Sequence, residues 1–242
     1  MAVTVILHGD LYIFLPRGKR CEGPFEKVLE RRTSVKDFLE AHGVPHPEIY
    51  RITVNGEEKD FGYIVAENDR IEVMPFPSPV NLATDTLLRP PLKQVSFIVD
   101  VNVQKLAGLL RMAGFDALCD PDFDDSRLAE ISGVENRILL TRDRALLKRK
   151  TVVHGRIIRS IVPVEQLREV VSLYGLAGEV KPFTRCLLCN ENLVPVEKAE
   201  VIDRLEPLTI KYFDAFHICP KCGKLFWGGS HRDSMLEYLK GI

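Results

Sequence analysis

The first 76 residues alternate between hydrophobic and polar positions in a pattern that predicts a small β-rich domain. Strands are expected over residues 3–7, 49–54 and 69–75, and the Asn55-Gly56 pair after the second of these is a strong hairpin signal. Residues 33–41 start with a capping hydroxyl and continue at helical period, which predicts a helix. The order strand, strand, helix, strand, strand is that of a β-grasp domain.

From residue 95 onward the pattern changes to short apolar runs that alternate with helical segments. Such runs are typical of parallel strands that are buried on both faces of a sheet. We therefore expect a three-layer α/β/α domain with a parallel sheet over residues 95–180. Its expected strands are residues 95–100, 115–119, 137–143 and 157–162, and a helix is expected from Pro163 to Tyr174.

The segment between these two domains, residues 77–94, is rich in proline and shows no periodicity. Pro77, Pro79, Pro90 and Pro91 favour an extended backbone. We expect this segment to be a linker and the domain boundary to lie within it.

Two CxxC pairs stand near the C-terminus, Cys186-Leu187-Leu188-Cys189 and Cys219-Pro220-Lys221-Cys222-Gly223. Each tight turn presents two sulfurs, and four thiolates at this spacing suit a tetrahedral zinc ion. Because sulfur fills all four positions, we expect a structural zinc within a zinc ribbon over residues 181–242 that ends in a helix. The other cysteines, Cys21 and Cys119, have no spacing that suggests a disulfide framework, so we expect a reducing, cytoplasmic location.

Composition and charge exclude some classes of protein but do not indicate a function. The 242 residues are 45% hydrophobic and 28% charged, with a formal net charge of −1, as in ordinary soluble proteins. No apolar run reaches the length of a membrane span, and the first ten residues resemble a strand rather than a signal peptide. The near-zero charge excludes a grossly basic nucleic-acid-binding protein, but it leaves room for local basic patches.

Acidic residues close two of the predicted strands in the α/β domain. Asp100 and Asp143 stand at the sheet edge where ligands bind in open parallel sheets. Asp125 lies in the first turn of a helix predicted between them. Three carboxylates in one small volume repel unless a cation neutralises them, and hard oxygen ligands suit Mg²⁺ or Mn²⁺. Each aspartate is also explained as a helix N-cap, and this second interpretation stays open.

Parts of the β-rich segment, residues 33–39, 54–57 and 68–73, resemble the ubiquitin-like sulfur carriers. Members of that family end in a free Gly-Gly that is activated at its carboxylate. Here the chain continues into Pro75-Phe76-Pro77-Ser78-Pro79, so a binding or structural role is the better interpretation.

The rest of the chain resembles the Mut7-C RNase family, a branch of the PIN-like nucleases that is often accompanied by an N-terminal ubiquitin-like domain and a zinc ribbon. The similarity lies in residues 97–100, 105–107, 110–116, 138–144, 182–186, 219–223 and 227–231. It implies metal-dependent cleavage of RNA, with Asp100, Asp125 and Asp143 as the acidic motif that holds Mg²⁺ or Mn²⁺. Asp124 is an alternate for Asp125, and Glu130 is a weaker candidate. Asn102 stands where the family usually has an apolar residue, and its part in the metal site stays open.

Basic residues flank these acids. Lys105 and Arg111 lie on the helix predicted after Asp100, and Arg142 and Arg144 bracket Asp143. Positive charge beside a metal site suits RNA phosphates, so we expect these four side chains to bind substrate. The run 148–150 fits RNA contact and a solvated helix face equally well. In the ribbon, cations are mixed with Phe226 and Trp227, which suits unpaired bases or, equally, a small apolar core.

The leading hypothesis is a metal-dependent endoribonuclease that acts on transfer RNA or another structured RNA. Its ubiquitin-like domain would bind a protein partner or cover the active site as a lid. The alternative is a non-catalytic RNA- or ribosome-associated protein that binds through the ribbon and the basic helix. A haloacid-dehalogenase-like phosphatase is disfavoured, because that chemistry usually needs a second acid where Asn102 stands. The sequence shows no Gly-rich phosphate loop and no Ser–His or Cys–His triad signature.

Overall fold

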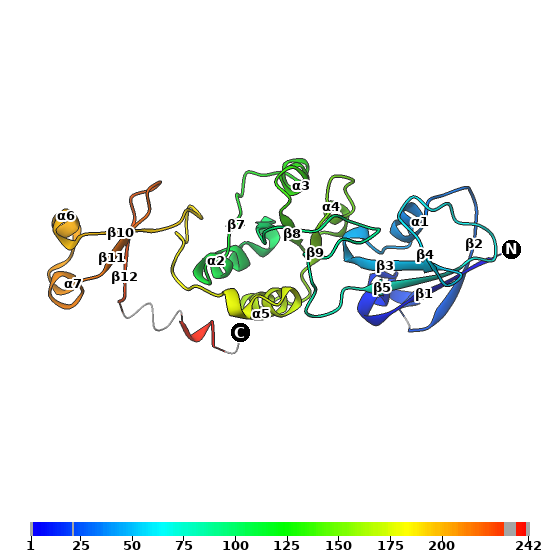
Figure 1. The fold of residues 1–242 in the computed structure, drawn as a ribbon, viewed down its shortest axis with the longest axis horizontal. Coiled ribbons are helices and arrows are strands. Elements are labelled where there is room, and N and C mark those ends of the chain that lie inside the picture. The colour runs from blue at the N-terminus through cyan, green and yellow to red at the C-terminus, as the bar shows by residue number, and fades with distance from the viewer. Residues whose placement is uncertain (1, 21, 230–235, 241–242) are drawn as a thin grey trace.

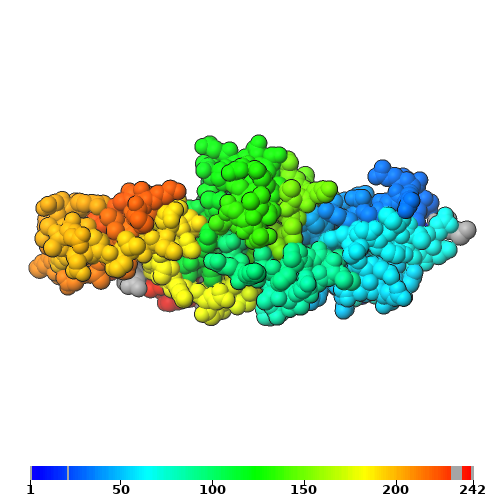
Figure 2. Space-filling view, turned by 45° about the horizontal axis from the view of Figure 1, so that its top comes forward, coloured from blue at the N-terminus to red at the C-terminus, as the bar shows by residue number. Residues whose placement is uncertain are grey.

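The computed structural model of the protein describes residues 2–20, 22–229 and 236–240, so Cys21, Ser230 and His231 lie outside the described residues. Three parts follow one another along the long axis of the molecule (Figure 1). An N-terminal sheet lies at one end, a second sheet with helices on both faces lies in the middle, and a small three-stranded sheet lies at the other end. The space-filling view shows helix α3 (Asp125–Val134) standing out from the middle of this elongated body (Figure 2).

The N-terminal part is a five-stranded mixed sheet with one helix against it. Strand β1 lies parallel to β5 and antiparallel to β2, which gives the strand order β2-β1-β5-β3-β4. The Ser34 side chain caps α1 by accepting a hydrogen bond from the Asp37 backbone N–H at 3.1 Å. The predicted β-grasp fold is confirmed. Its elements are β1 (Ala2–Leu7), β2 (Pro24–Val28), α1 (Val35–Ala41), β3 (Ile49–Val54), β4 (Glu57–Glu58) and β5 (Arg70–Pro75).

The middle part contains a four-stranded sheet in the order β7-β6-β8-β9, and every pair of neighbours is parallel. The predicted parallel sheet is therefore confirmed. Its strands are β6 (Phe97–Val99), β7 (Ala117–Leu118), β8 (Ile138–Thr141) and β9 (Gly155–Ile157). Its helices are α2 (Gln104–Met112), α3 (Asp125–Val134), α4 (Arg144–Leu147) and α5 (Pro163–Tyr174).

Alternate residues of the middle sheet face two different cores. Phe97 and Val99 belong to a core with Leu106 of α2 and Leu167 of α5. Ile98, which lies between them, points to the opposite face, because successive side chains of a strand alternate. Its core includes residues of α3 and α4 and continues without a break into the interior of the β-grasp domain. The two N-terminal parts therefore share one hydrophobic core.

The fourth expected strand was wrong in its extent. Residues 158–162 are not part of β9, which ends at Ile157. Just after it, the Arg159 backbone N–H donates to Glu169 of α5 at 3.0 Å, and the Val162 N–H donates to the Ser160 hydroxyl at 3.0 Å. The apolar run thus turns away from the sheet to start α5, which begins and ends as predicted.

The proline-rich segment packs against both domains. The Val80 N–H donates to the Leu173 carbonyl at 2.7 Å, which ties this segment to α5. The buried guanidinium of Arg89 donates to the carbonyls of His46 and Pro47 in the β-grasp domain, at 3.2 and 3.1 Å. Burial lowers the pKa of Arg89 to about 10. These contacts make the segment a structural connection between the domains.

The C-terminal part is a three-stranded antiparallel sheet that carries two short helices between its first two strands. Phe216, Val201 and Leu205 form its small core. Its elements are β10 (Val194–Val196), α6 (Lys198–Val201), α7 (Pro207–Tyr212), β11 (Phe216–Ile218) and β12 (Leu225–Trp227). Only residues 236–240 of the expected C-terminal helix are described; residues 236 and 237 are helical, and residues 238–240 form a turn. Among the described residues, no helix has the length and apolar character of a membrane span.

Candidate metal centres

The four predicted zinc ligands come together in the structure. The Sγ atoms of Cys186, Cys189, Cys219 and Cys222 all lie within 4.8 Å of one another. Cys186 and Cys219 are buried, which removes the inner side of the cluster from water. Four sulfurs with this mutual spacing fit a tetrahedral zinc ion.

The two cysteine pairs are built as matching turns. The Asn190 N–H donates to the Cys186 carbonyl at 3.0 Å, and the Gly223 N–H donates to the Cys219 carbonyl at 2.9 Å. Asn190 and Gly223 both have left-handed backbone angles, with φ of 66° and 70°, a conformation that asparagine and glycine tolerate best. A hydrogen bond from the Lys224 backbone lowers the pKa of Cys222 to about 7, which favours its thiolate form.

Asp100 lies at the carboxyl end of β6 and is 6% exposed. Its carboxylate accepts hydrogen bonds from the Thr141 hydroxyl at 2.6 Å and from the Asn102 side-chain amide at 2.5 Å. Both donors are neutral, and within the described part of the chain no cation pairs with Asp100. Buried charges are usually paired with an opposite charge or bound to a metal. A bound cation would therefore compensate the negative charge of the Asp100 carboxylate.

Asp143 follows β8, the strand next to β6, and caps the short helix α4. Its Oδ1 atom accepts hydrogen bonds from the N–H groups of Ala145 and Leu146, at 2.6 and 3.3 Å. The Asp143 N–H in turn donates to the Thr141 hydroxyl at 2.9 Å. One buried hydroxyl therefore links Asp100 and Asp143, and Oδ2 of Asp143 accepts no hydrogen bond from any described residue.

Asp125 is the first residue of α3 and stands 3.8 Å from Arg149 of the loop after α4. Its neighbour Asp124 is the N-cap of α3, since it accepts a hydrogen bond from the Arg127 N–H at 2.7 Å. Glu130 is exposed and pairs with Arg127 at 2.8 Å. All three acids therefore have a partner: the α3 backbone for Asp124, Arg149 for Asp125 and Arg127 for Glu130.

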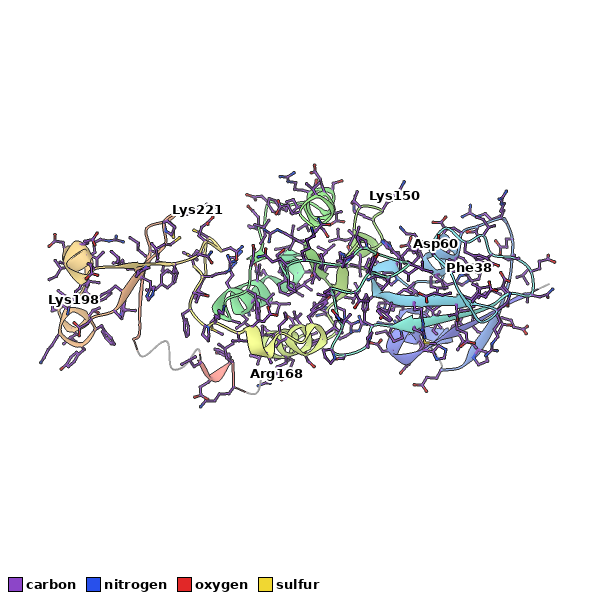
Figure 3. All side chains as sticks on the ribbon, viewed as in Figure 1. Phe38, Asp60, Lys150, Arg168, Lys198 and Lys221 are labelled. Atoms are coloured by element: carbon purple, nitrogen blue, oxygen red, sulfur yellow. The ribbon has the colours of Figure 1, made fainter. Side chains whose placement is uncertain are left out.

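A cavity of about 630 Å³ opens beside Asp125, between α3 and the loop after α4. Its walls carry three cations and two acids. The lining residues are Asp124, Ser126, Arg127, Ala129, Glu130, Arg149, Lys150 and Thr151. Figure 3 shows Lys150 on the side of the molecule that carries α3.

The structure does not draw the predicted acids into a tight cluster. Among the described residues, the cysteines are the one group of three or more His, Cys, Asp or Glu ligand atoms close enough to hold a single ion. Asp100 and Asp143 follow neighbouring strands at one edge of the sheet and Asp125 starts α3, and the three carboxylates do not meet that spacing.

The sequence analysis did not identify Asp120. Ile98 pairs with Leu118, so Asp100 and Asp120 each lie two residues beyond this pair, at the same edge of the sheet. Burial raises the pKa of the nearby Cys119 thiol, and the carboxylates of Asp100 and Asp120 add to that rise. The signal was present in the sequence, since Asp120 closes a predicted strand as Asp100 and Asp143 do.

The four basic residues predicted to bind substrate separate into two pairs. We call the edge of the middle sheet that carries Asp100 and Asp143 the acidic edge. Lys105 and Arg142 are exposed beside it, and the Arg142 backbone N–H donates to the Asn102 side chain at 3.1 Å. Arg144 is turned toward the β-grasp domain, where its guanidinium donates to the carbonyls of Ile13 and Phe14. Arg111 is 7% exposed. The surroundings of the last two side chains do not fit contact with a substrate.

Arg111 joins the middle domain to the cysteine turn. Its guanidinium donates to the carbonyls of Leu187 and Leu188, both at 3.0 Å, and to the Ala117 carbonyl at 2.8 Å. Burial lowers its pKa. Asp116 makes a second link, because it accepts hydrogen bonds from Asn190 at 2.7 Å and from Arg137 at 2.6 Å.

Comparison with known proteins agrees with this arrangement. Residues 1–81 match the Mut7-C ubiquitin family, and residues 95–239 match the Mut7-C RNAse domain family. No curated protein and no solved structure matches the chain. The second family model spans more than half of the chain, and the two matches follow the order of the β-grasp, α/β and cysteine regions seen in the structure. The chain belongs to the Mut7-C RNase family and carries the ubiquitin-like domain of that family at its N-terminus.

Proposed function

We propose that the protein is a metal-dependent endoribonuclease whose active site lies at the carboxyl edge of the middle sheet. The buried Asp100 carboxylate carries this proposal, because its hydrogen-bond partners are neutral and a divalent cation would complete its surroundings. The RNase family supports the reaction class.

Asp100, Asp125 and Asp143 would hold the ion, with Asp120 as an added candidate next to Asp100. Carboxylate oxygens with water completing the shell suit Mg²⁺ or Mn²⁺. When bound, the ion would supply Lewis-acid chemistry for attack of water on a phosphodiester. Thr141 and Asn102 would orient the Asp100 carboxylate for this task.

RNA phosphates would be held by the exposed cations near these acids. Lys105 and Arg142 flank Asp100 and Asp143, and the cavity beside Asp125 adds Arg127, Arg149 and Lys150. Cations at such positions bind the sugar–phosphate backbone without reading its sequence. Structured RNA, including transfer RNA, is the proposed substrate class.

The cysteine cluster would hold a structural zinc ion. All four positions are sulfur, which leaves no open position for catalysis. The ion would fix the ribbon against the middle domain through the turn that Arg111 contacts. Reduced thiols of this kind persist in the cytoplasm, which is the proposed location.

A second function is favoured by the capping geometry. Asp100, Asp124 and Asp143 each accept a hydrogen bond from the first turn of the helix that follows. If capping is their whole role, the protein binds RNA through its ribbon and basic residues without cleaving it. The two functions differ in whether a divalent ion is needed.

The test is cleavage of total and transfer RNA in Mn²⁺ or in EDTA. Wild type, Asp100→Asn and the control Asp85→Asn, which changes an exposed acid in the connecting segment, are compared side by side. We expect cleavage by wild type and by the control in Mn²⁺ only, and a loss of about a hundredfold or more in Asp100→Asn. Tight RNA binding without cleavage by any variant would instead establish the non-catalytic function.

A further inference from the structure

Helix α4 begins at Asp143 and contains only four residues, Arg144–Leu147. A helix of this length has no stability of its own, because the cost of nucleation exceeds what so few hydrogen bonds return. The contacts of α4 with its surroundings therefore decide where its N-cap, Asp143, is placed. Strands β8 and β9 and helix α3 pack along α4, and the ubiquitin-like domain adds hydrogen bonds at its two ends.

The first residue of α4 is held by the segment that follows β1. Arg144 donates to the carbonyl of Phe14 at 2.9 Å and to that of Ile13 at 3.2 Å. Its guanidinium also lies over the Phe14 ring, 5.0 Å from the ring centroid. Burial in this position lowers the pKa of Arg144. Arg144, the residue next to Asp143, is thus bound to the ubiquitin-like domain.

The other end of α4 is held by α1 and the loop after it. The Lys148 ammonium donates to the Glu40 carbonyl at 2.6 Å. His46 bridges the Glu40 carboxylate and the Val152 carbonyl, at 2.6 and 2.7 Å. Between these contacts, Leu146 and Leu147 are fully buried in the core that both domains share. The ubiquitin-like domain therefore contacts α4 at its first residue, Arg144, and at Lys148 just after its last residue.

A buried acid anchors the two domains beside this contact. Glu48 has no exposed surface, and it accepts hydrogen bonds from the Ile157 N–H at 2.6 Å and from Arg156 at 2.7 Å. Arg159 pairs with the same carboxylate and with Asp10, at 3.1 and 3.0 Å. A buried charge compensated in this way fixes the relative position of the partners, because removing either partner leaves an unpaired ion.

We propose that the ubiquitin-like domain acts within its own chain as a brace that positions Asp143, and that Arg144 and Lys148 are the positioning residues through which it acts. The proposal rests on the proposed function only in giving Asp143 a role at the site. It differs from the lid considered above, because Val101, Asn102 and Arg142 at the acidic edge are exposed with the ubiquitin-like domain in place. The ubiquitin-like domain contacts one side of the proposed site and leaves the exposed residues of the acidic edge uncovered.

The test uses the full chain with Arg144→Ala and Lys148→Ala, and Arg31→Ala as an exposed control on the ubiquitin-like domain. Three quantities are measured: amide hydrogen exchange of residues 144–148, Mn²⁺ affinity by electron paramagnetic resonance, and kcat and KM for RNA cleavage. A denaturant titration checks that each variant is folded.

We expect amide exchange over α4 to accelerate by about tenfold or more in both variants, since each loses one end of the brace. Mn²⁺ affinity should fall several-fold, and kcat should fall by about tenfold or more with KM nearly unchanged, as for a misplaced catalytic group. Arg142→Ala should show the reverse pattern, a raised KM with kcat retained, because its side chain is exposed at the site.

Unchanged amide exchange in folded Arg144→Ala and Lys148→Ala would overturn the brace. If amide exchange is faster but Mn²⁺ affinity stays as in wild type, the ubiquitin-like domain stabilises α4 without positioning Asp143. This result would overturn the positioning role. If wild type shows no metal-dependent cleavage, the proposed function fails, and exchange together with Mn²⁺ affinity still decides the brace.

Discussion

The cysteine cluster and the acidic edge are the two metal sites that the sequence predicts, and their ligands come from different kinds of backbone element. Each cysteine pair sits in one tight turn, so local backbone geometry alone brings two sulfurs together. Asp100 and Asp143 come from the ends of separate strands and each cap a following helix, and Asp125 comes from the first turn of α3. The four sulfur atoms lie within 4.8 Å of one another, whereas the aspartate oxygens do not form a group of that spacing among the described residues.

The difference follows from the charge of the groups. Neutral thiols can approach one another and lose their protons as zinc binds, so a preformed cluster costs little. Carboxylates in general carry their charge before a metal binds, so they repel one another at close range unless a cation is bound between them. A site of the first kind is suited to a permanent structural ion, and a site of the second kind to an exchangeable catalytic one.

The largest expected effect is loss of the ribbon. Cys219→Ser removes a buried zinc ligand, and structural zinc in small domains contributes on the order of 10 kcal/mol to folding. We expect the variant to lose zinc and residues 186–227 to lose protection from amide exchange, while the middle sheet keeps it. Cys119→Ser, which lies outside the cluster, should retain one zinc per chain. Zinc retention by Cys219→Ser would show that the cluster is not the zinc site.

The pH dependence of stability tests the effect of burying His154 in the middle domain. Burial lowers the pKa of His154 to about 4 from an ordinary value of 6.5, so between these values the unfolded chain binds a proton that the folded chain does not. The free energy of unfolding should therefore fall as the pH drops from about 6.5 to 4, by about 3 kcal/mol from this residue. Denaturant titrations across this range should give a flatter profile for His154→Gln. Equal slopes in the two proteins would exclude His154 as the cause.

Arg111 lies where the two regions meet. Arg111→Met removes a buried guanidinium that donates to four carbonyls of the middle domain and the cysteine turn, so we expect stability to fall by about 2 kcal/mol. Zinc content and KM for RNA should stay as in wild type. Arg142→Met should behave in the opposite way, with unchanged stability and a raised KM. A raised KM in Arg111→Met would restore Arg111 as a substrate-binding residue.

The smallest expected effect concerns the hydroxyl that links the acids. Thr141→Val keeps the shape of a fully buried side chain but removes its hydrogen bonds to Asp100 and Asp143. We expect kcat to fall by about tenfold, as for other residues that orient metal ligands. Thr209→Val, a similar change in the ribbon, should leave cleavage unchanged. Equal cleavage by Thr141→Val and wild type would remove this link from the account.

Much of the fold follows from local signals in the sequence. The helix from Pro163 to Tyr174 has its bounds as predicted, because a proline starts it and a left-handed Gly175 ends it. The β-grasp order and the cysteine cluster were predicted for the same reason, since turns and periodicity determine them. The strand ends were predicted less well, and residues 158–162 turned away from the sheet.

The docking of the ubiquitin-like domain could not be predicted. It depends on Glu48, an acid with no distinctive neighbours in the sequence, which pairs with arginines more than 100 residues away. Arg142 and Arg144 look alike in sequence, yet one is exposed at the acidic edge and the other is held by Phe14. Such differences arise from contacts between domains, which a pattern along the chain does not record.

The most direct test of the account is equilibrium Mn²⁺ binding to zinc-loaded wild type and Asp100→Asn, followed by electron paramagnetic resonance with zinc measured in the same samples. The account predicts one zinc per chain in both proteins, reversible Mn²⁺ binding by wild type, and loss of that binding in Asp100→Asn. Equal Mn²⁺ binding by the two proteins would contradict it, because the cation would then lie away from the acidic edge.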